Sequence, residues 1–425
     1  MSRRRERPNA ALLAVGWVSL ANCGGTAPQP DWSTVRDTLP SGTIRVTNIP
    51  PANIASAETP PTWTLEEELR VGTVEGTGPD AFAYLKGLVA LEDGRFAVLD
   101  SQVQELRVFG PDGTHIATHG GHGEGPGEFA DANGLMLDPQ SRIWVPDTRN
   151  GRMSVFDPEE GFVQSFRFAD ANFNSRWNGA LVDGNRIYRP WRSGNRARLH
   201  VYDLTMTRVD SLPLPGDAPE EEEWDPASQP GAFYQEMGGG YMMYGIPFYP
   251  SEVRHLDPRG TFWSTRDGDP QYRIKRWRPG GDTTLLVEAR RPPVAVPAVE
   301  RDSVIDMLRE MVSSMGVGAW DWSRVPSFRP AVEEIFTSAE GNLWVRTPSR
   351  GEGALFDVYS EDGEYLGTAS LGPGFGSGLR LFDRVTPVVR GDLIWLIATD
   401  ELDVSYVVRA RIAPAADASL QGSPQ

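Results

Sequence analysis

Three histidines within eight residues are the first side chains in this sequence whose types could support chemistry. His115, His119 and His122 lie in and just before a glycine-rich stretch, residues 119–129. His115 and His119 are four residues apart, so both would face one side of an extended strand. Three converging imidazoles can hold zinc, which makes these residues weak candidates for a metal site. The alternative interpretation is three exposed histidines at the rim of a sheet.

Carboxylate and amide side chains at predicted strand ends are the next candidates. Asp100 and Asp147 occupy the same position in two related segments. A repeated position favours a repeated structural role, in which the carboxylate accepts backbone N–H groups in an Asx turn. Asp131 and Asn133 precede a predicted inner strand, and we expect them at a channel mouth. Calcium would need several such groups from different strands, and one pair is not enough.

Motifs for covalent chemistry and for phosphate binding are missing from the sequence. It has no Gly-x-Ser-x-Gly motif, and its one cysteine, Cys23, lies in the N-terminal segment. Residues 120–127 join strand to strand without a following Lys-Ser/Thr, which excludes a P-loop. The catalytic residues are therefore unknown, and we predict no cofactor. Calcium or zinc would enter only with the alternative function given below.

Aromatic and arginine side chains gather near two irregular stretches of the chain. Exposed aromatic residues beside arginine favour recognition of a protein or a glycan. Ordinary packing of inserted segments is the alternative interpretation. The candidate partner surface comprises Tyr241, Tyr244, Phe248, Tyr249, Arg189 and Arg192.

All these side chains must be positioned by strands, and the strands repeat. Leu88 and Asp100 recur as Leu135 and Asp147, each 47 residues later. Each copy contains two predicted strands around a tight turn, followed by a third strand and a fourth. Four strands at this period are typical of a propeller blade. We expect six units, at residues 87–118, 134–166, 179–203, 253–288, 333–370 and 386–412.

The predicted fold class is all-β, a six-bladed β-propeller over residues 63–413 with one helical insert. The sixth unit shows three strands, so residues 63–71 would supply the fourth and close the ring. Two inserts interrupt the repeats, at about 214–245 and 292–327.

The second insert contains the predicted helix. Val304, Leu308, Met311 and Met315 share one face of it, Ser303 and Asp306 suit a capping box, and Gly316 suits a helix end. We expect this helix to lie on the propeller surface.

The N-terminal segment has the features of a secretory signal. Basic residues 3–7 precede an apolar segment, 10–20, that is too short to span a bilayer. Leu20, Ala21 and Cys23 resemble a bacterial lipobox, which implies a signal peptide at 1–22 and lipidation at Cys23. Gly24 then favours the outer membrane. A plain secretory signal with an incidental cysteine is the alternative.

Composition divides the remaining residues. Proline, threonine and alanine dominate residues 24–62, which predicts a flexible tether over 23–62, and a disordered tail is expected at 414–425. The chain has net charge −17, and residues 1–22 carry four Arg and one Glu, so the mature part carries −20. Such an acidic protein is not expected to bind nucleic acid.

The link between the first two units resembles the link of NHL-type repeats. The matching residues are Gly120, Gly123, Gly125, Pro126, Gly127, Glu128 and Phe129. The body as a whole resembles bacterial six-bladed β-propeller lipoproteins with NHL-like repeats. This resemblance implies a fold and an envelope location, outer-membrane or periplasmic, but no single function, since propellers host binding proteins, lyases, lactonases and scaffolds.

Two functions remain open at this point. We expect a ligand-binding or scaffolding module without catalysis, for an envelope protein, a peptide or a glycan, with a lipid anchor as its only membrane contact. The alternative is a metal-dependent hydrolase or lyase, lactonase-like, with calcium or zinc at the propeller channel.

Overall fold

The computed structural model describes most of the chain between residues 32 and 415. The described ranges are 32–51, 61–168, 177–193, 196–214, 225–266, 268–316, 318, 320–348, 355–372, 375, 378–382 and 385–415. The expected signal peptide, the lipidation site Cys23 and the tail beyond residue 415 lie outside them. No helix within these ranges has the length and apolar character to cross a membrane.

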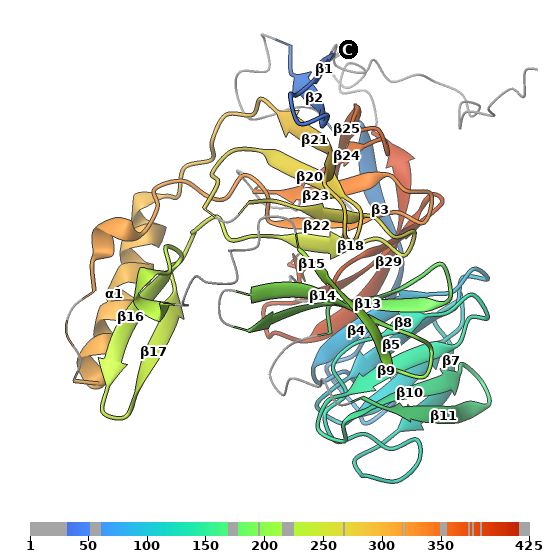
Figure 1. Cartoon of the computed structure of the whole chain (residues 1–425). Helices are drawn as coiled ribbons and strands as arrows, with labels where there is room; N and C mark the ends of the chain where they lie inside the picture. The colour runs from blue at the N-terminus through green and yellow to red at the C-terminus, as the bar shows by residue number, and fades with distance from the viewer. Residues whose placement is uncertain are drawn as a thin grey trace, which may run out of the picture.

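The described strands form six blades around a central axis (Figure 1). In the first three blades, consecutive strands pair in antiparallel fashion from the inner strand to the outer one. Blade one contains β4 (Leu85–Ala90), β5 (Phe96–Asp100), β6 (Glu105–Phe109) and β7 (His115–Gly120), blade two contains β8 (Met136–Leu137), β9 (Ile143–Asp147), β10 (Arg152–Asp157) and β11 (Gly161–Arg167), and blade three contains β12 (Ala180–Val182), β13 (Arg186–Ser193), β14 (Arg196–Tyr202) and β15 (Arg208–Pro213).

Blades four and five follow the same order of strands, whereas in blade six the first two strands both pair with the third; strands from the N-terminal part pair with all three blades. Blade four contains β18 (Arg254–Leu256), β19 (Phe262–Ser264), β20 (Arg273–Trp277) and β21 (Thr283–Ala289), blade five contains β22 (Glu334–Thr337), β23 (Leu343–Thr347), β24 (Leu355–Tyr359) and β25 (Tyr365–Leu371), and blade six contains β26 (Arg380–Leu381), β27 (Val388–Arg390), β28 (Leu393–Thr399) and β29 (Ser405–Pro414).

Each seam between consecutive blades has its own hydrophobic core. Blades one and two share Val89, Leu99, Phe129 and Ile143, and the seam between blades six and one contains Trp395 and residues of both. A seam of this kind exists for every neighbouring pair of blades in the described structure. Apolar burial therefore stabilises the blade contacts around the whole ring.

An N-terminal strand closes the ring, as the sequence predicted. Strand β3 (Trp63–Val71) pairs in antiparallel fashion with β29 of blade six along its whole length. Its first three residues also pair in parallel with β25 of blade five. The two edges that an open sheet would expose are thus paired.

Phe129 holds the seam between blades one and two. Its side chain is fully buried and lies 5.4 Å from the ring of Phe156. Gly120 makes room for it, because a Cβ on Gly120 would lie 2.5 Å from the Phe129 ring, and the φ of Gly120 is +98°. The glycine-rich link is therefore shaped by packing and by backbone conformation.

Residues 32–51, which composition assigned to the flexible tether, instead form part of blade four. Strands β1 (Ser33–Thr38) and β2 (Ile44–Ile49) make a hairpin, and β2 pairs in parallel with β21. Val46 is fully buried in the core between blades four and five. The predicted tether is wrong for these residues, because Val46 and Asn48 of β2 are buried against blades four and five, a contact that a linker-like composition does not reveal.

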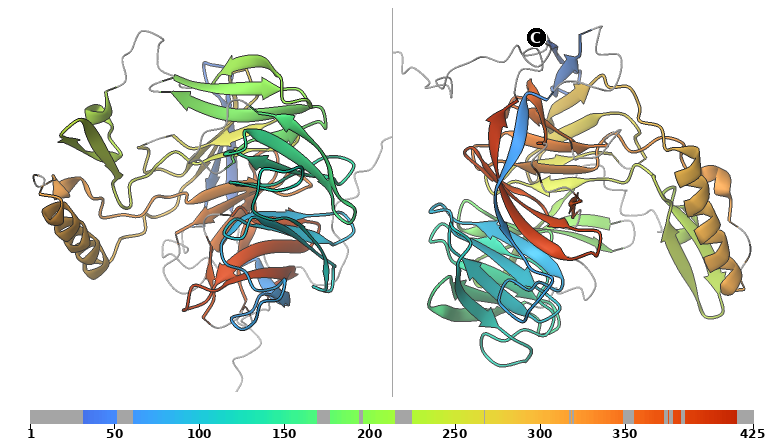
Figure 2. Two further views of the ribbon diagram at one scale, coloured as in Figure 1. Left: turned by 90° about the horizontal axis from the view of Figure 1, so that it is seen from below. Right: turned by 180° about the vertical axis from the view of Figure 1, so that it is seen from behind.

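The two inserts form one unit that projects from the ring, as Figures 1 and 2 show. This insert module contains strands β16 (Ala232–Met237) and β17 (Gly240–Gly245) and helix α1 (Ala298–Ser314). Its separate core consists of Phe233, Ile246, Ile305, Leu308, Val312, Trp320 and Val325.

The helix was correctly expected, but its position and its beginning were not. Its apolar face packs on the β16–β17 hairpin and not on the propeller, because Phe233 and Trp320 supply the apolar partner. The helix begins after Pro297 without a side-chain cap, so Ser303 and Asp306 are not its capping box. Gly316, at φ +68°, follows its end as predicted.

Candidate functional site

A cavity of about 770 Å³ lies at the centre of the ring. The inner strands of all six blades contribute to it, namely β4, β8, β12, β18, β22 and β27. The blades are held in the ring by their seams, so this is the place where residues far apart in sequence meet. It is therefore the candidate functional site.

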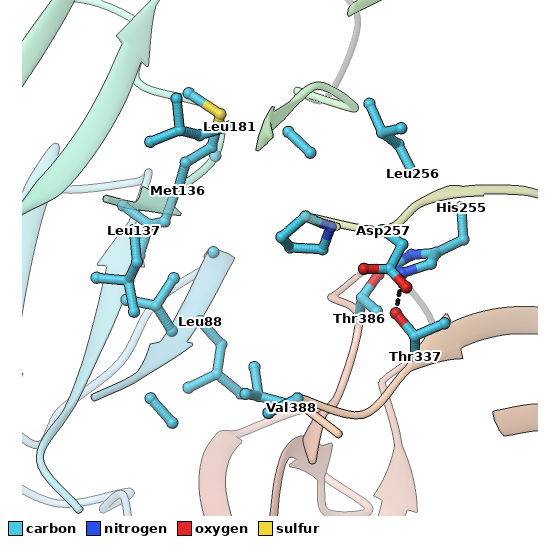
Figure 3. Close-up of a pocket in the computed structure, with 18 of the residues that line it drawn as sticks. Leu88, Met136, Leu137, Leu181, His255, Leu256, Asp257, Thr337, Thr386 and Val388 are labelled. Atoms are coloured by element: carbon cyan, nitrogen blue, oxygen red, sulfur yellow. Dashed lines mark hydrogen bonds between the residues drawn. The ribbon is translucent and has the colours of Figure 1, made fainter. Parts of the chain in front are cut away.

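The wall of the cavity has an apolar side and a polar side. Figure 3 shows leucine, methionine and valine side chains from several blades facing a group of polar residues from blades four, five and six. The polar side comprises His255, Asp257, Thr337 and Thr386, with Leu256 beside them, and the apolar side comprises Leu88, Met136, Leu137, Leu181 and Val388.

His255 is the central residue of the polar side. It lies on β18 of blade four, and its Nε2 is 2.9 Å from Oγ1 of Thr337 on β22 of blade five. Burial lowers the pKa of His255 to about 4, with Arg259 lowering it further and Asp257 opposing the shift. The imidazole is therefore neutral at pH 7, and it can donate one hydrogen bond and accept another.

Acidification should destabilise the protein through His255. The pKa of His255 is about 4 in the folded protein and near 6.5 in the unfolded chain. The contribution of the neutral imidazole to the free energy of unfolding is therefore present above pH 6.5 and is lost as pH falls towards 4. The natural protein should lose free energy of unfolding between pH 7 and pH 4, and we expect this loss to be about 1–3 kcal/mol smaller in His255→Gln. The range is reduced because the ring is only partly buried. Urea unfolding at both pH values measures the loss. The control is His122→Gln, and equal losses in both variants would contradict the prediction.

The three histidines proposed for metal binding do not converge. The ring nitrogen Nε2 of His115 lies 2.8 Å from Oγ1 of Thr118, and that of His119 lies 3.0 Å from the carbonyl oxygen of Pro158. His122 Nε2 lies 3.3 Å from the carbonyl oxygen of Gln102. Across the described residues, no group of three His, Cys, Asp or Glu side chains could hold a metal ion.

Asp100 and Asp147 have the expected structural role. The carboxylate of Asp100 accepts the backbone N–H groups of Ala83 and Tyr84, at 2.8 and 3.1 Å. Asp147 accepts those of Ala130 and Asp131 in the same way, at 3.1 and 3.0 Å. Each aspartate thus fixes the chain that enters the inner strand of its blade.

The pair expected at the channel mouth lies beside the cavity. Asp131 accepts a hydrogen bond from Oγ1 of Thr148 and lies 3.6 Å from the Lys86 ammonium group, which lines the cavity. Asn133 is buried. Asp131 is therefore paired with a residue that lines the cavity and is not itself part of the lining.

The residues expected on one partner surface are separated. Arg189 is buried in blade three, with its guanidinium 5.2 Å from the ring of Phe168 and 5.4 Å from that of Trp177. The prediction of an exposed Arg189 is wrong because these two rings enclose it. The side chain of Arg192 lies outside the described residues. On the insert module Tyr241 is half exposed, whereas Tyr244, Phe248 and Tyr249 pack against its core.

His255 and Thr337 were missed as site residues, although the sequence carries a signal for His255. In blade two the inner strand reads Met136-Leu137-Asp138-Pro139, and in blade four it reads His255-Leu256-Asp257-Pro258. The shared Asp-Pro turn places His255 at the position of Met136, which lines the cavity. Aligning the units on this turn would have placed His255 at the channel.

Comparison of the sequence with models of protein families agrees with this architecture. The model of the DUF5128 family, described as a 6-bladed beta-propeller, matches residues 83–255. No curated protein matches the chain.

Solved structures with a similar fold share little sequence with the chain. A member of the duf4221 family from Bacteroides vulgatus is 11% identical, with a TM-score of 0.50 over 83% of this chain and 99% of that one. A putative exported protein from Bacteroides fragilis is 14% identical, with a TM-score of 0.45 over 87% and 99%. A virginiamycin B lyase from Staphylococcus aureus, solved with quinupristin, is 13% identical, with a TM-score of 0.40 over 81% and 99%. By fold, the chain is a six-bladed β-propeller.

Proposed function

We propose that this protein is an envelope binding protein that holds a small molecule in its central cavity without transforming it. The observation that carries the proposal is the cavity itself, with one apolar side and one polar side. Its volume of about 770 Å³ falls in the range of roughly 300–1,000 Å³ typical of small-molecule sites. Apolar walls provide affinity in such sites, and a few polar groups orient the ligand.

Two of the three aspartates that line the cavity fix turns of the chain, which supports binding over catalysis. Asp138 accepts the indole N–H of Trp144 at 3.0 Å and the Nε–H of Arg142 at 2.7 Å. Asp257 accepts the backbone N–H of Arg259 at 2.8 Å and is paired with its guanidinium. A carboxylate that fixes a turn in this way is poorly placed to exchange protons with a ligand.

Export and anchoring belong to the same proposal, and residues 1–23 support them. If Cys23 carries a lipid, only nine residues lie between it and the first residue of β1, Ser33. Ten Cα–Cα steps reach at most about 35 Å, so the propeller would stay close to the membrane surface. An envelope protein, a peptide or a glycan remains the expected partner of the insert module.

Filling the cavity should abolish binding of a small apolar probe. We expect Leu137→Trp to weaken binding of N-phenyl-1-naphthylamine at least tenfold, because the larger ring occupies the apolar side of the cavity. Fluorescence titration of the purified mature protein measures the affinity. The control is Val163→Trp, which places the same ring on the exposed outer strand β11.

Two outcomes would contradict the proposed function. One is equal probe affinity in Leu137→Trp and Val163→Trp, which would place the probe outside the channel. The other is one equivalent of calcium or zinc in the purified protein that EDTA removes together with a hydrolase or lyase activity, which would support the alternative.

A further inference from the structure

Charged side chains at the central cavity, apart from Asp183, are paired with one another or with residues beside the cavity. Lys86 lies 3.6 Å from Asp131, and Arg390 lies 3.6 Å from Glu92. The remaining pairs are Arg254 with Glu252, Asp138 with Arg142, and Asp257 with Arg259. Asp183 is the remaining charged residue of the lining, and it is exposed on its turn.

These pairs leave little net charge for a ligand. Binding of an anion in a cavity normally uses Arg or Lys groups whose charge is not already neutralised. A charged ligand group that leaves water without such a partner loses its hydration free energy and gains no ion pair in return. The apolar side favours apolar ligand groups, because displacing water from Leu88, Met136 and Leu181 lowers the free energy of the complex.

On the polar side, Asp257 is paired with Arg259, whereas His255 and Thr337 add hydrogen-bonding capacity without formal charge. His255 and Thr337 are joined to each other across the seam between blades four and five. A hydroxyl or carbonyl group could share hydrogen bonds with this pair, because both side chains can donate and accept.

We infer that the ligand of the central cavity is an uncharged, largely apolar molecule. This inference rests on the proposed function and narrows it to one chemical class. It follows from the paired charges around the cavity, from its apolar side, and from the neutral, hydrogen-bonded pair His255 and Thr337 opposite that side.

A matched pair of fluorescent probes tests this inference. N-phenyl-1-naphthylamine is uncharged, and 8-anilinonaphthalene-1-sulfonate has the same ring system with one added sulfonate. We expect the mature protein to bind the uncharged probe at least tenfold more tightly, with Leu137→Trp weakening that binding. Equal or tighter cavity binding of the sulfonate would overturn the inference and leave the proposed function standing. Failure of both probes to bind in the cavity would count against the proposed function itself.

A second variant tests the cause of the preference. Glu92→Gln removes the partner of Arg390 at an exposed position, so we expect the affinity for the sulfonate to rise severalfold and that for the uncharged probe to stay constant. The control is Glu159→Gln, which removes one of the two carboxylate partners of Arg95 away from the cavity. An unchanged sulfonate affinity in Glu92→Gln would contradict the role of charge pairing.

Discussion

Replacing Arg291 by methionine is expected to lower the free energy of unfolding by about 3–5 kcal/mol. The guanidinium of Arg291 is paired with the carboxylate of Asp357, whose side chain is fully buried on β24. Thr368 donates a further hydrogen bond to the same carboxylate oxygen, at 3.1 Å. The substitution would leave a buried negative charge without its cation, and urea unfolding of the purified protein measures the loss.

The loss should depend on pH in a defined direction. Burial raises the pKa of Asp357, and the charge of Arg291 opposes that rise. Without Arg291 the folded pKa rises further above the unfolded value near 3.9, so protonation stabilises the folded variant as pH falls. The difference between the natural protein and Arg291→Met should therefore shrink between pH 7 and pH 5. A constant difference would contradict this assignment of the charge.

Two comparisons separate the buried pair from an ordinary surface pair. Arg309→Met breaks a pair with Asp306 in which both side chains are exposed, and we expect a loss below about 1 kcal/mol. Adding Asp357→Leu to Arg291→Met should recover much of the lost stability, because the unpaired charge is then absent. A double variant no more stable than Arg291→Met would show that packing, and not charge, determines the loss.

The propeller was predictable because the apolar residues that form its seams recur at a fixed spacing in the sequence. Leu88, Val98 and Phe109 in blade one recur as Leu135, Val145 and Phe156, 47 residues later, and each set packs in the core of a seam. Closure was predictable for a related reason. A sixth unit with one strand missing requires a partner, and Trp63–Val71 was the remaining strand-like segment next to the repeats.

The additions to the ring were not predictable from local pattern alone. The face of α1 was recognised through Leu308 and Met311, but its partner, Phe233, comes from an insert about seventy residues earlier in the chain. No local rule joins the two inserts. The two inserts are joined by hydrophobic contact, and this contact forms only after blades three, four and five have brought the ends of the inserts together.

The cavity shows the same limit for site residues. His255 and Thr337 are 82 residues apart and meet because blades four and five are neighbours. Arg189 was misjudged because an arginine among aromatic residues can lie on a surface or between two rings, and Trp177 was not recognised as its partner. The histidines of the glycine-rich link attracted attention by spacing, although their strand lies on the outer side of its blade.

Removing the N-terminal hairpin should destabilise the propeller by roughly 5 kcal/mol. Full burial of Val46 contributes about 1.5–3 kcal/mol. The side-chain amide of Asn48 donates to the carbonyl oxygen of Gly363 and accepts from the backbone N–H of Tyr365, both at 3.0 Å. Loss of these partners leaves polar groups of blade five unpaired, at a cost of about 1–3 kcal/mol.

The hairpin also covers the Arg291–Asp357 pair, which links this prediction to the first one. The ring of Trp32 stacks on Tyr365 at 4.0 Å and lies 5.2 Å from the Arg291 guanidinium. A chain that starts at Pro51 should therefore expose the pair to water, whereas a chain that starts at Trp32 should keep it covered. In the shorter chain Arg291→Met should cost less, because water then solvates Asp357.

Comparing these two chains shows whether the N-terminal hairpin stabilises the propeller or serves only as a tether. Urea unfolding of the chain from Trp32 should match that of the full mature protein, and the chain from Pro51 should unfold at a lower urea concentration. Val46→Ala should reproduce part of the loss, and Val35→Ala, on the exposed strand β1, should have little effect. Equal midpoints for both chains would mean that the hairpin is a tether after all. A lower midpoint for the shorter chain means that the segment linking the propeller to its proposed anchor also holds blades four and five together, so that folding and membrane attachment share the same residues.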